Sequence, residues 1–167
     1  MPITWKQAPV PLYSSTILTT STITSFLHSF HTGKDSAGYG VELLDGFIVP
    51  VPDAEWALSL SAEEIFRRHS EEVKKEPRVE KRMWVFQPVL VIDERSVQDG
   101  SVVVGSWEAR YQSDDEDGEM KLVEGFESVR IVKEQIQSVA ANIYIGNQDL
   151  ETYQTTVDED GIWRGFH

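Results

Sequence analysis

The chain between residues 101 and 112 reads Ser-Val-Val-Val-Gly-Ser-Trp-Glu-Ala-Arg-Tyr-Gln. Its β-branched and aromatic residues predict a strand. Four side chains share one side of the strand's alternation: Val103, Trp107, Ala109 and Tyr111. A turn is expected before it at Asp99-Gly100, and residues 121–132 predict the next strand, in which Gly125 suggests a bulge. The middle of the chain is therefore expected to form a β-meander.

Strands and helices alternate before this meander. Residues 13–20 predict a strand, and residues 21–30 predict a helix with one apolar face. Ser61 and Glu64 form a capping-box pattern, which predicts a second helix that ends before Pro77. This order of elements is typical of a sheet covered by helices.

The C-terminal part of the chain predicts a short helix, capped by Asn147 and stopped by Asp160-Gly161. Several prolines in residues 1–12 predict an extended N-terminal arm. We therefore expect residues 13–167 to form a single domain of the α/β or α+β class. Its mixed sheet should carry two or three helices and a short C-terminal helix.

The chain is strongly acidic, with a formal net charge of −13 over 167 residues. This charge repels nucleic acid and anionic membranes, so we expect neither as a partner, whereas a cationic partner is permitted. Solubility alone is the simpler purpose of such a charge. The chain has no cysteine, which excludes disulfides and thiolate sites. With no apolar run near the roughly 20 residues of a membrane span and no signal-peptide pattern, we expect a cytoplasmic protein.

Metal and cofactor signals are weak. Residues 113–124 place oxygen-bearing side chains and Gly118 at the spacing of a calcium-binding EF-hand loop, but an acidic hairpin tip explains them better. His28 and His31 are three residues apart on the expected first helix, and two surface histidines are the simpler interpretation. We find no glycine-rich phosphate loop and no nucleophile elbow, so we predict no metal and no cofactor.

Two carboxylates are the candidates for acid–base chemistry if the protein is an enzyme. Residues 83–92 predict a strand in which Pro88 must lie at an edge or a bulge, and Asp93 follows it directly. A strand end can hold a carboxylate rigidly in a pocket, although Asp93 can equally anchor the next turn. Glu108 is the second candidate. An apolar pocket beside them would be lined by aromatic side chains, namely Trp84, Phe86, Trp107 and Tyr111.

The last thirty residues carry a dense pattern. It comprises Asn142, the run Asn147-Gln148-Asp149-Leu150-Glu151, and the run Val157-Asp158-Glu159-Asp160-Gly161-Ile162-Trp163-Arg164-Gly165-Phe166. This pattern resembles an uncharacterised family of small bacterial and fungal proteins, a domain of unknown function. Residues 91–99 resemble the family's strand-to-turn segment. Where that family tends to have Arg-Thr-Asp-Phe-Ser-Asp, this chain has residues 18–23 without charged groups. The resemblance implies a fold and no activity.

Two functions stay open at this stage. The first is a binding module that recognises a protein or small-molecule partner. Arg164 either pairs with Asp158 or Asp160 or receives a carboxylate of the partner. The other candidate contact residues are Trp163, Trp107, Tyr111 and Trp84. The second is a cofactor-independent isomerase or cyclase that acts on a hydrophobic metabolite, with Asp93 and Glu108 moving protons. The oligomeric state is left open.

Overall fold

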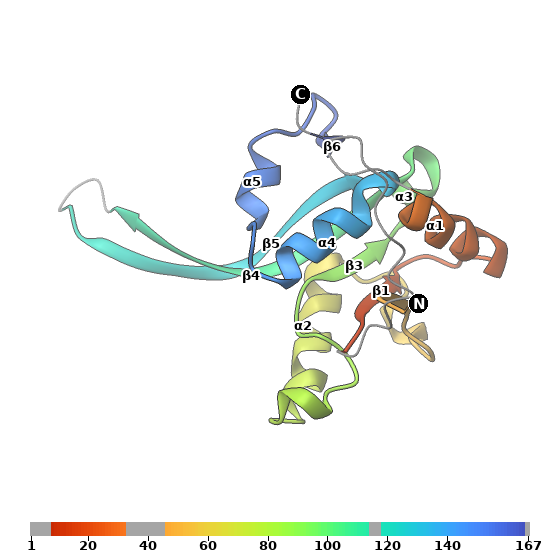
Figure 1. Ribbon diagram of the computed structural model, residues 1–167, viewed down its shortest axis with the longest axis horizontal. Coiled ribbons are helices and arrows are strands. Elements are labelled where there is room, and N and C mark those ends of the chain that lie inside the picture. Colours follow the sequence, from red (N-terminus) through yellow and green to blue (C-terminus); the bar gives the residue numbers. More distant parts are fainter. Residues whose placement is uncertain (1–7, 33–45, 114–117, 166–167) are drawn as a thin grey trace, which may run out of the picture.

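The computed structural model describes residues 8–32, 46–113 and 118–165, with the side chains of residues 31 and 32 left out. Its centre is a six-stranded mixed sheet in the order β2-β1-β3-β4-β5-β6 (Figure 1). The strands are β1 (Val10–Ser14), β2 (Ile48–Pro50), β3 (Val89–Ile92), β4 (Ser101–Ser113), β5 (Met120–Val132) and β6 (Ile162–Trp163). β2, β1 and β3 run parallel, β4 is antiparallel to both β3 and β5, and β6 is parallel to β5.

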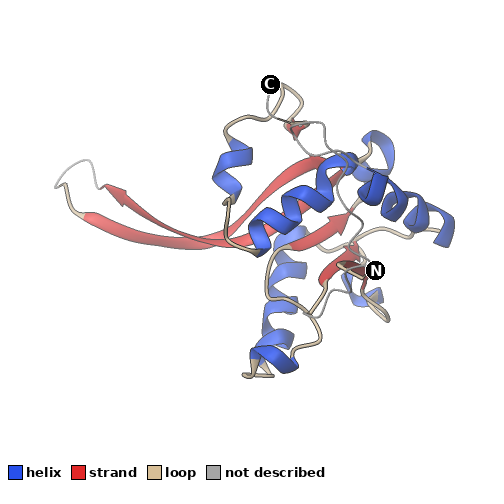
Figure 2. Ribbon diagram, viewed as in Figure 1, coloured by secondary structure: helices blue, strands red, loops and turns tan. Residues whose placement is uncertain are grey.

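Helices lie on both faces of this sheet (Figure 2). The α-helices are α1 (Thr20–Thr32), α2 (Ala62–Lys74), α3 (Glu94–Asp99), α4 (Ile136–Tyr144) and α5 (Leu150–Gln154), and short 3₁₀ helices lie at Glu55–Ala57, Val79–Lys81 and Lys133–Gln135. Leu90 and Ile92 of β3 join the core beneath α1 and α4, whereas Val89 and Val91 join the core beneath α2. A parallel strand that is apolar on both sides needs such cover. The single-domain α+β class expected from the sequence is confirmed.

The two connections of β2 explain why α1 and α2 lie on opposite faces. The chain leaves β1 through α1 and returns in β2 on one side of β1, then crosses through α2 to β3 on the other side. Two crossovers of the same hand that run in opposite directions place their helices on opposite faces of the sheet. The loops that follow β1 and β2 therefore diverge.

The start of α2 confirms the capping box expected at Ser61. The Ser61 hydroxyl accepts the Glu64 backbone N–H at 3.2 Å, and the Glu64 carboxylate accepts the Ser61 backbone N–H at 2.9 Å. Each bond satisfies a donor that the first helical turn leaves without a partner.

The first strand lies earlier than the sequence predicts. β1 covers Val10–Ser14, so residues 10–12, expected in an extended arm, form a central strand with Val10 and Leu12 buried. Prolines suggested an arm because they cannot donate a ladder bond. The pairing of β1 with β3 begins only at Leu12, which faces Leu90, so Pro11 costs that ladder no bond.

Three other local expectations are wrong. The strand expected at 83–92 is reduced to β3, which begins directly after Pro88. The bulge expected at Gly125 is absent, because β4 and β5 pair without interruption from Ser101↔Val132 to Ser113↔Met120. The cap of α5 is Asp149 instead of Asn147, since the Asp149 carboxylate accepts the Thr152 backbone N–H at 3.1 Å.

A buried histidine joins β1, α2 and the segment before β3. The Tyr13 hydroxyl lies 2.9 Å from His69 Nδ1, and His69 Nε2 lies 2.8 Å from the Val85 carbonyl. Because a carbonyl only accepts, Nε2 carries the proton, and Nδ1 accepts the tyrosine proton in the neutral ring. Burial lowers the pKa of His69, and the bond to Val85 only partly offsets it. Burial, together with the charge of Glu72, raises the pKa of Tyr13 to about 12.

We expect this arrangement to make the fold acid-sensitive. The folded pKa of His69 lies below the value of about 6.5 for an unfolded chain, so its contribution to stability is complete above that pH. The contribution should fall as the pH drops below about 6.5 towards the folded pKa. Chemical denaturation measured at several pH values between about 7.5 and 5.5 checks this. His69→Gln keeps one donor and one acceptor, and should flatten the curve; an equal slope in both proteins would contradict the assignment.

Candidate functional site

Asp93 lies at the carboxyl end of β3 and is fully engaged. Its carboxylate accepts the backbone N–H of Ser96 at 2.9 Å, which caps α3, and it forms a two-bond ion pair with the Arg130 guanidinium. Burial pushes its pKa up, but the bonds from Arg130 and Ser96 outweigh burial and lower the pKa. The structure therefore places Asp93 as an ionised anchor of the segment that follows β3.

Glu108 lies far from Asp93. Arg130 binds both Asp93 and the Ser101 hydroxyl, so Asp93 lies beside the first residue of β4. From Ser101 to Glu108 an extended strand covers roughly 23 Å at about 3.3 Å per residue. Burial raises the pKa of Glu108, and the charges of Asp149 and Glu127 add to this. At such a separation the two carboxylates do not face one another.

The candidates Trp163 and Arg164 lie in the folded C-terminal segment of residues 149–165, which we call the clasp. Trp163 is buried against Tyr153, with 4.9 Å between the ring centres, and its indole N–H donates to Thr156 at 3.0 Å. Arg164 binds the carboxylates of both Asp158 and Asp160, at 2.7 and 2.6 Å. Its hydrogen bonds hold the pKa of Asp160 at about 2. Of the two roles considered for Arg164, the internal pair is the one formed.

The aromatic candidates separate into two places. Trp84 is half-buried and lines a cavity of about 510 Å³ together with Arg82, Phe86 and Tyr144. Trp107 and Tyr111 lie instead on the outer half of β4, with 44% and 68% of their surfaces exposed. The structure therefore does not gather these side chains into one pocket.

The outer half of the β4–β5 hairpin, Trp107–Ser113 with Met120–Phe126, projects from the body of the molecule (Figure 1). We call it the arm. β3 pairs with β4 only as far as Gly105, and β6 pairs with β5 only at Arg130 and Ile131. Among the described residues the arm is thus a ribbon of two strands.

The arm has one apolar face and one charged face. Side chains of directly paired residues share a face, and on the apolar face these pairs are Trp107↔Phe126, Ala109↔Glu124, Tyr111↔Leu122 and Ser113↔Met120. Met120 is 61% exposed and Leu122 is 50% exposed. On the charged face Arg110 forms ion pairs with Glu127 and with Glu151 of α5. The charged face is therefore tied to the body, whereas the apolar face meets solvent.

The apolar face continues into the core beneath α2. The Phe126 ring lies 5.2 Å from the Phe66 ring of α2, and Phe66 lies 5.7 Å from Phe86. Phe126 fits here because Gly105 has no side chain: a Cβ at Gly105 would lie 2.5 Å from the Phe126 ring. The base of the arm is thus fixed by an aromatic ring packed over a glycine.

Half of the apolar face was missed from the sequence. Trp107 and Tyr111 were named, but Met120, Leu122 and Phe126 were not. Their even spacing in the chain was the available signal, because it places them on one side of a strand. Only the register of β4 against β5 shows that both sets form one surface.

The weak metal signals gain no support within the described residues. No cluster of potential metal ligands occurs there. Of the EF-hand-like stretch, residues 114–117 lie outside the described residues, and Glu124 lies in regular strand β5. His28 is exposed on α1. None of the described helices has the length and apolarity required to cross a membrane.

Substitution of Gly105 tests the base of the arm. Gly105→Ala should destabilise the fold by about 1–3 kcal/mol, because the new methyl group displaces the Phe126 ring from Phe66. Gly125→Ala is the matched control in the same hairpin, since no atom lies within 4 Å of its added Cβ. Urea denaturation of both variants measures the difference. Equal stabilities would show that Phe126 moves aside without cost.

Comparison with known proteins gives a family and no activity. No curated protein and no solved structure matches the chain. Residues 41–166 match the family described as domain of unknown function DUF6924. This match includes α2, the arm and the C-terminal clasp. The chain therefore belongs to the DUF6924 family.

Proposed function

We propose that this protein is a binding module that docks onto a basic protein partner through the apolar face of its arm. The observation that carries the proposal is that Trp107, Tyr111, Leu122 and Met120 lie together on that face and remain between 44% and 68% exposed. Contiguous apolar surface of this kind marks interaction sites in folded proteins. Trp and Tyr are also the residues that most often dominate interface energies.

The shape of the arm supports the same conclusion. A ribbon of two strands is marginally stable in water, and a third layer that covers its apolar face would stabilise it. Burial of apolar surface contributes roughly 25 cal/mol per Å². The charged face is already occupied by the ion pairs of Arg110 with Glu127 and Glu151. The apolar face is therefore the side on which a partner gains most.

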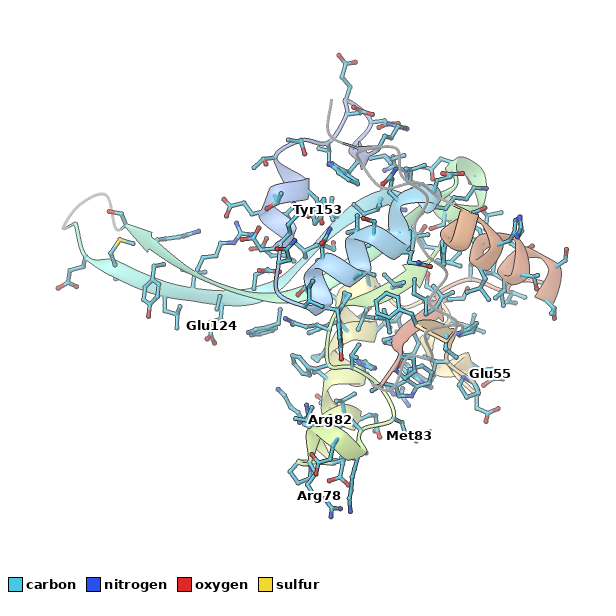
Figure 3. All side chains as sticks on the ribbon, in the orientation of Figure 1. Glu55, Arg78, Arg82, Met83, Glu124 and Tyr153 are labelled. Carbon is cyan, nitrogen blue, oxygen red and sulfur yellow. The ribbon has the colours of Figure 1, made fainter. Side chains whose placement is uncertain are left out.

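Charge indicates the kind of partner. The whole chain carries a net charge of −13, which attracts basic surfaces and speeds their encounter. Glu124 lies within the apolar face and, in Figure 3, on the side of the arm from which α2 projects. A partner that combines apolar side chains with Lys or Arg would match both properties. A carboxylate amid apolar contacts would then select against neutral partners.

A catalytic role has less support. Asp93 lies beside the first residue of β4, whereas Glu108 lies in the outer half of that strand, and Asp93 is already used as the cap of α3 and as the ion-pair partner of Arg130. No described cavity is lined by both residues. The isomerase or cyclase alternative therefore lacks an observation in its favour.

The experiment has two steps. A photo-cross-linking residue introduced as Tyr111→benzoylphenylalanine identifies the partner in cells, and purified partner is then titrated into the full chain. Leu122→Ser should weaken binding by about tenfold or more, because it removes a side chain from the centre of the interface. Val123→Ser is the matched control: Val123 is the next residue, is 46% exposed, and lies on the opposite face. It should change the affinity little.

Three results would contradict the proposal. An equal loss of affinity in Leu122→Ser and Val123→Ser would show that the partner does not prefer the apolar face. An affinity that does not fall with added salt would show that the partner is not recognised by its basic charge, because exposed charges are screened over about 10 Å at 0.1 M salt. If Leu122→Ser instead converted a dimer of this chain into a monomer in analytical ultracentrifugation, the occupant of the face would be a second copy.

A further inference from the structure

We propose a second site, separate from the arm, at the carboxyl ends of the parallel strands β2, β1 and β3. Its ligand is a small primary amine with an apolar tail. The strand order, a cavity at this edge and two carboxylates at its rim support this site. The site does not depend on the binding role of the arm.

The strand order opens a crevice at this edge. β1 lies next to β2, and the crossover helices that follow these two strands, α1 after β1 and α2 after β2, lie on opposite faces of the sheet. In open sheets with parallel strands, ligands bind outside the carboxyl ends of the strands at the point where the crossovers diverge. Backbone bonds fix the loops there: Ser15 N–H donates to the Ile92 carbonyl at 2.9 Å, and Val51 N–H donates to the Leu12 carbonyl at 3.0 Å.

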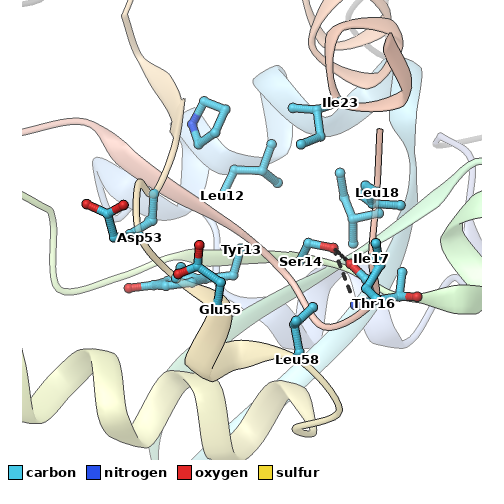
Figure 4. A pocket seen from close by; sticks show the side chains of 14 residues that line it. Leu12, Tyr13, Ser14, Thr16, Ile17, Leu18, Ile23, Asp53, Glu55 and Leu58 are labelled. Atoms are coloured by element: carbon cyan, nitrogen blue, oxygen red, sulfur yellow. Dashed lines mark hydrogen bonds between the residues drawn. The ribbon is translucent and has the colours of Figure 1, made fainter. Parts of the chain in front are cut away.

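A cavity of about 290 Å³ occupies this edge, next to the ends of β1 and β2. Figure 4 shows its lining divided by polarity, with Asp53 and Glu55 on one side and Leu18 and Ile23 on the other. The volume is at the lower end of the range of small-molecule sites. A ligand of this cavity is therefore small and has one polar and one apolar end.

The polar end of the ligand should be a cation. Neither Asp53 nor Glu55 has an ion pair or side-chain hydrogen bond with another described residue, and within the described ranges no Lys or Arg lines the cavity. The nearby Ser14 hydroxyl donates to the Thr16 carbonyl at 2.5 Å, so it is already used. An ammonium group supplies the donors that two carboxylates accept, whereas an anion would meet only repulsion.

The backbone at the rim adds a supporting observation. Asp53 has φ 52° and Ser59 has φ 65°, the left-handed region that non-glycine residues seldom adopt. Asp53 lines this cavity, and Ser59 lines the neighbouring hollow beside Asp93. Residues held in such conformations concentrate at ligand sites, where the surrounding structure maintains them.

The test uses n-hexylamine, which is cationic at neutral pH, with n-hexanol and hexanoate as neutral and anionic controls of equal length. Amide resonances of the full ¹⁵N-labelled chain are followed by NMR during each titration. We expect n-hexylamine to shift the amides of residues 12–18 and 51–58 with a dissociation constant on the order of 1 mM, as befits so small a ligand. Hexanol should bind more weakly, and hexanoate should not bind.

Variants separate charge from cavity. Asp53→Asn with Glu55→Gln should weaken hexylamine binding by about tenfold or more, because both charge-assisted bonds become neutral. Glu71→Gln with Glu119→Gln removes the same charge from two exposed residues elsewhere and is the matched control. Ile23→Trp should block the apolar end while leaving both carboxylates in place, and its unfolding curve verifies that it folds.

Several outcomes would overturn the site. If hexylamine produces no shifts, or shifts only the amides of residues that do not line the cavity, the cavity takes no amine. If hexanol or hexanoate bound as tightly as hexylamine, the two carboxylates would not select the charge of the ligand. Equal affinities in the Asp53/Glu55 and the Glu71/Glu119 variants would reduce the interaction to general charge attraction.

Discussion

The uninterrupted pairing of β4 with β5 is the constraint on which the rest of the molecule depends. The register runs from Ser101↔Val132 to Ser113↔Met120 without a bulge. Its inner half places Val102, Val104 and Ile131 in the core beneath α1 and α4, and Val103 in the core beneath α2. A shift of one residue in one strand would move all of that strand's side chains to the opposite face. The same register brings the side chains of the arm's apolar face together. The core and the candidate interface therefore both depend on this register.

Basic side chains are few in this chain, and several of them join elements instead of facing partners. Arg130 joins β5 to the end of β3 through Asp93, Arg110 joins the arm to α5, and Arg164 closes the C-terminal clasp. The clasp pairs are exposed, so each contributes little to stability in water. Their effect is positional, because each pair holds two segments of the chain together. Asp and Glu number 28 against 15 Lys and Arg, so a surplus of carboxylates remains for solvent and for partners however the cations are paired.

Local signals in the sequence predicted the elements whose causes are local. The capping box at Ser61 fixes the start of α2, and the alternating residues of β4 fix its two faces. β1 was misplaced because proline argues against a central strand, and only the partner's register shows that Pro11 costs no ladder bond. The arm was half predicted, since Trp107 and Tyr111 are visible in the sequence while their cross-strand neighbours follow from pairing. The crevice could not be predicted, because its lining comes from loops after different strands.

Helix α2 and the aromatic side chains around it connect the two proposed sites. Trp56 adjoins Glu55 in sequence and lies 5.3 Å from Tyr13, whose hydroxyl binds His69 of α2. Phe66, on the same helix, packs against Phe126 at the base of the arm. Contiguity alone does not make two sites communicate, because coupling requires an element with two discrete arrangements that both ligands bias. These rings are packed into one buried cluster held by a neutral histidine. Helix α2 therefore acts as a shared rigid support, and occupation of one site should leave the affinity of the other nearly unchanged.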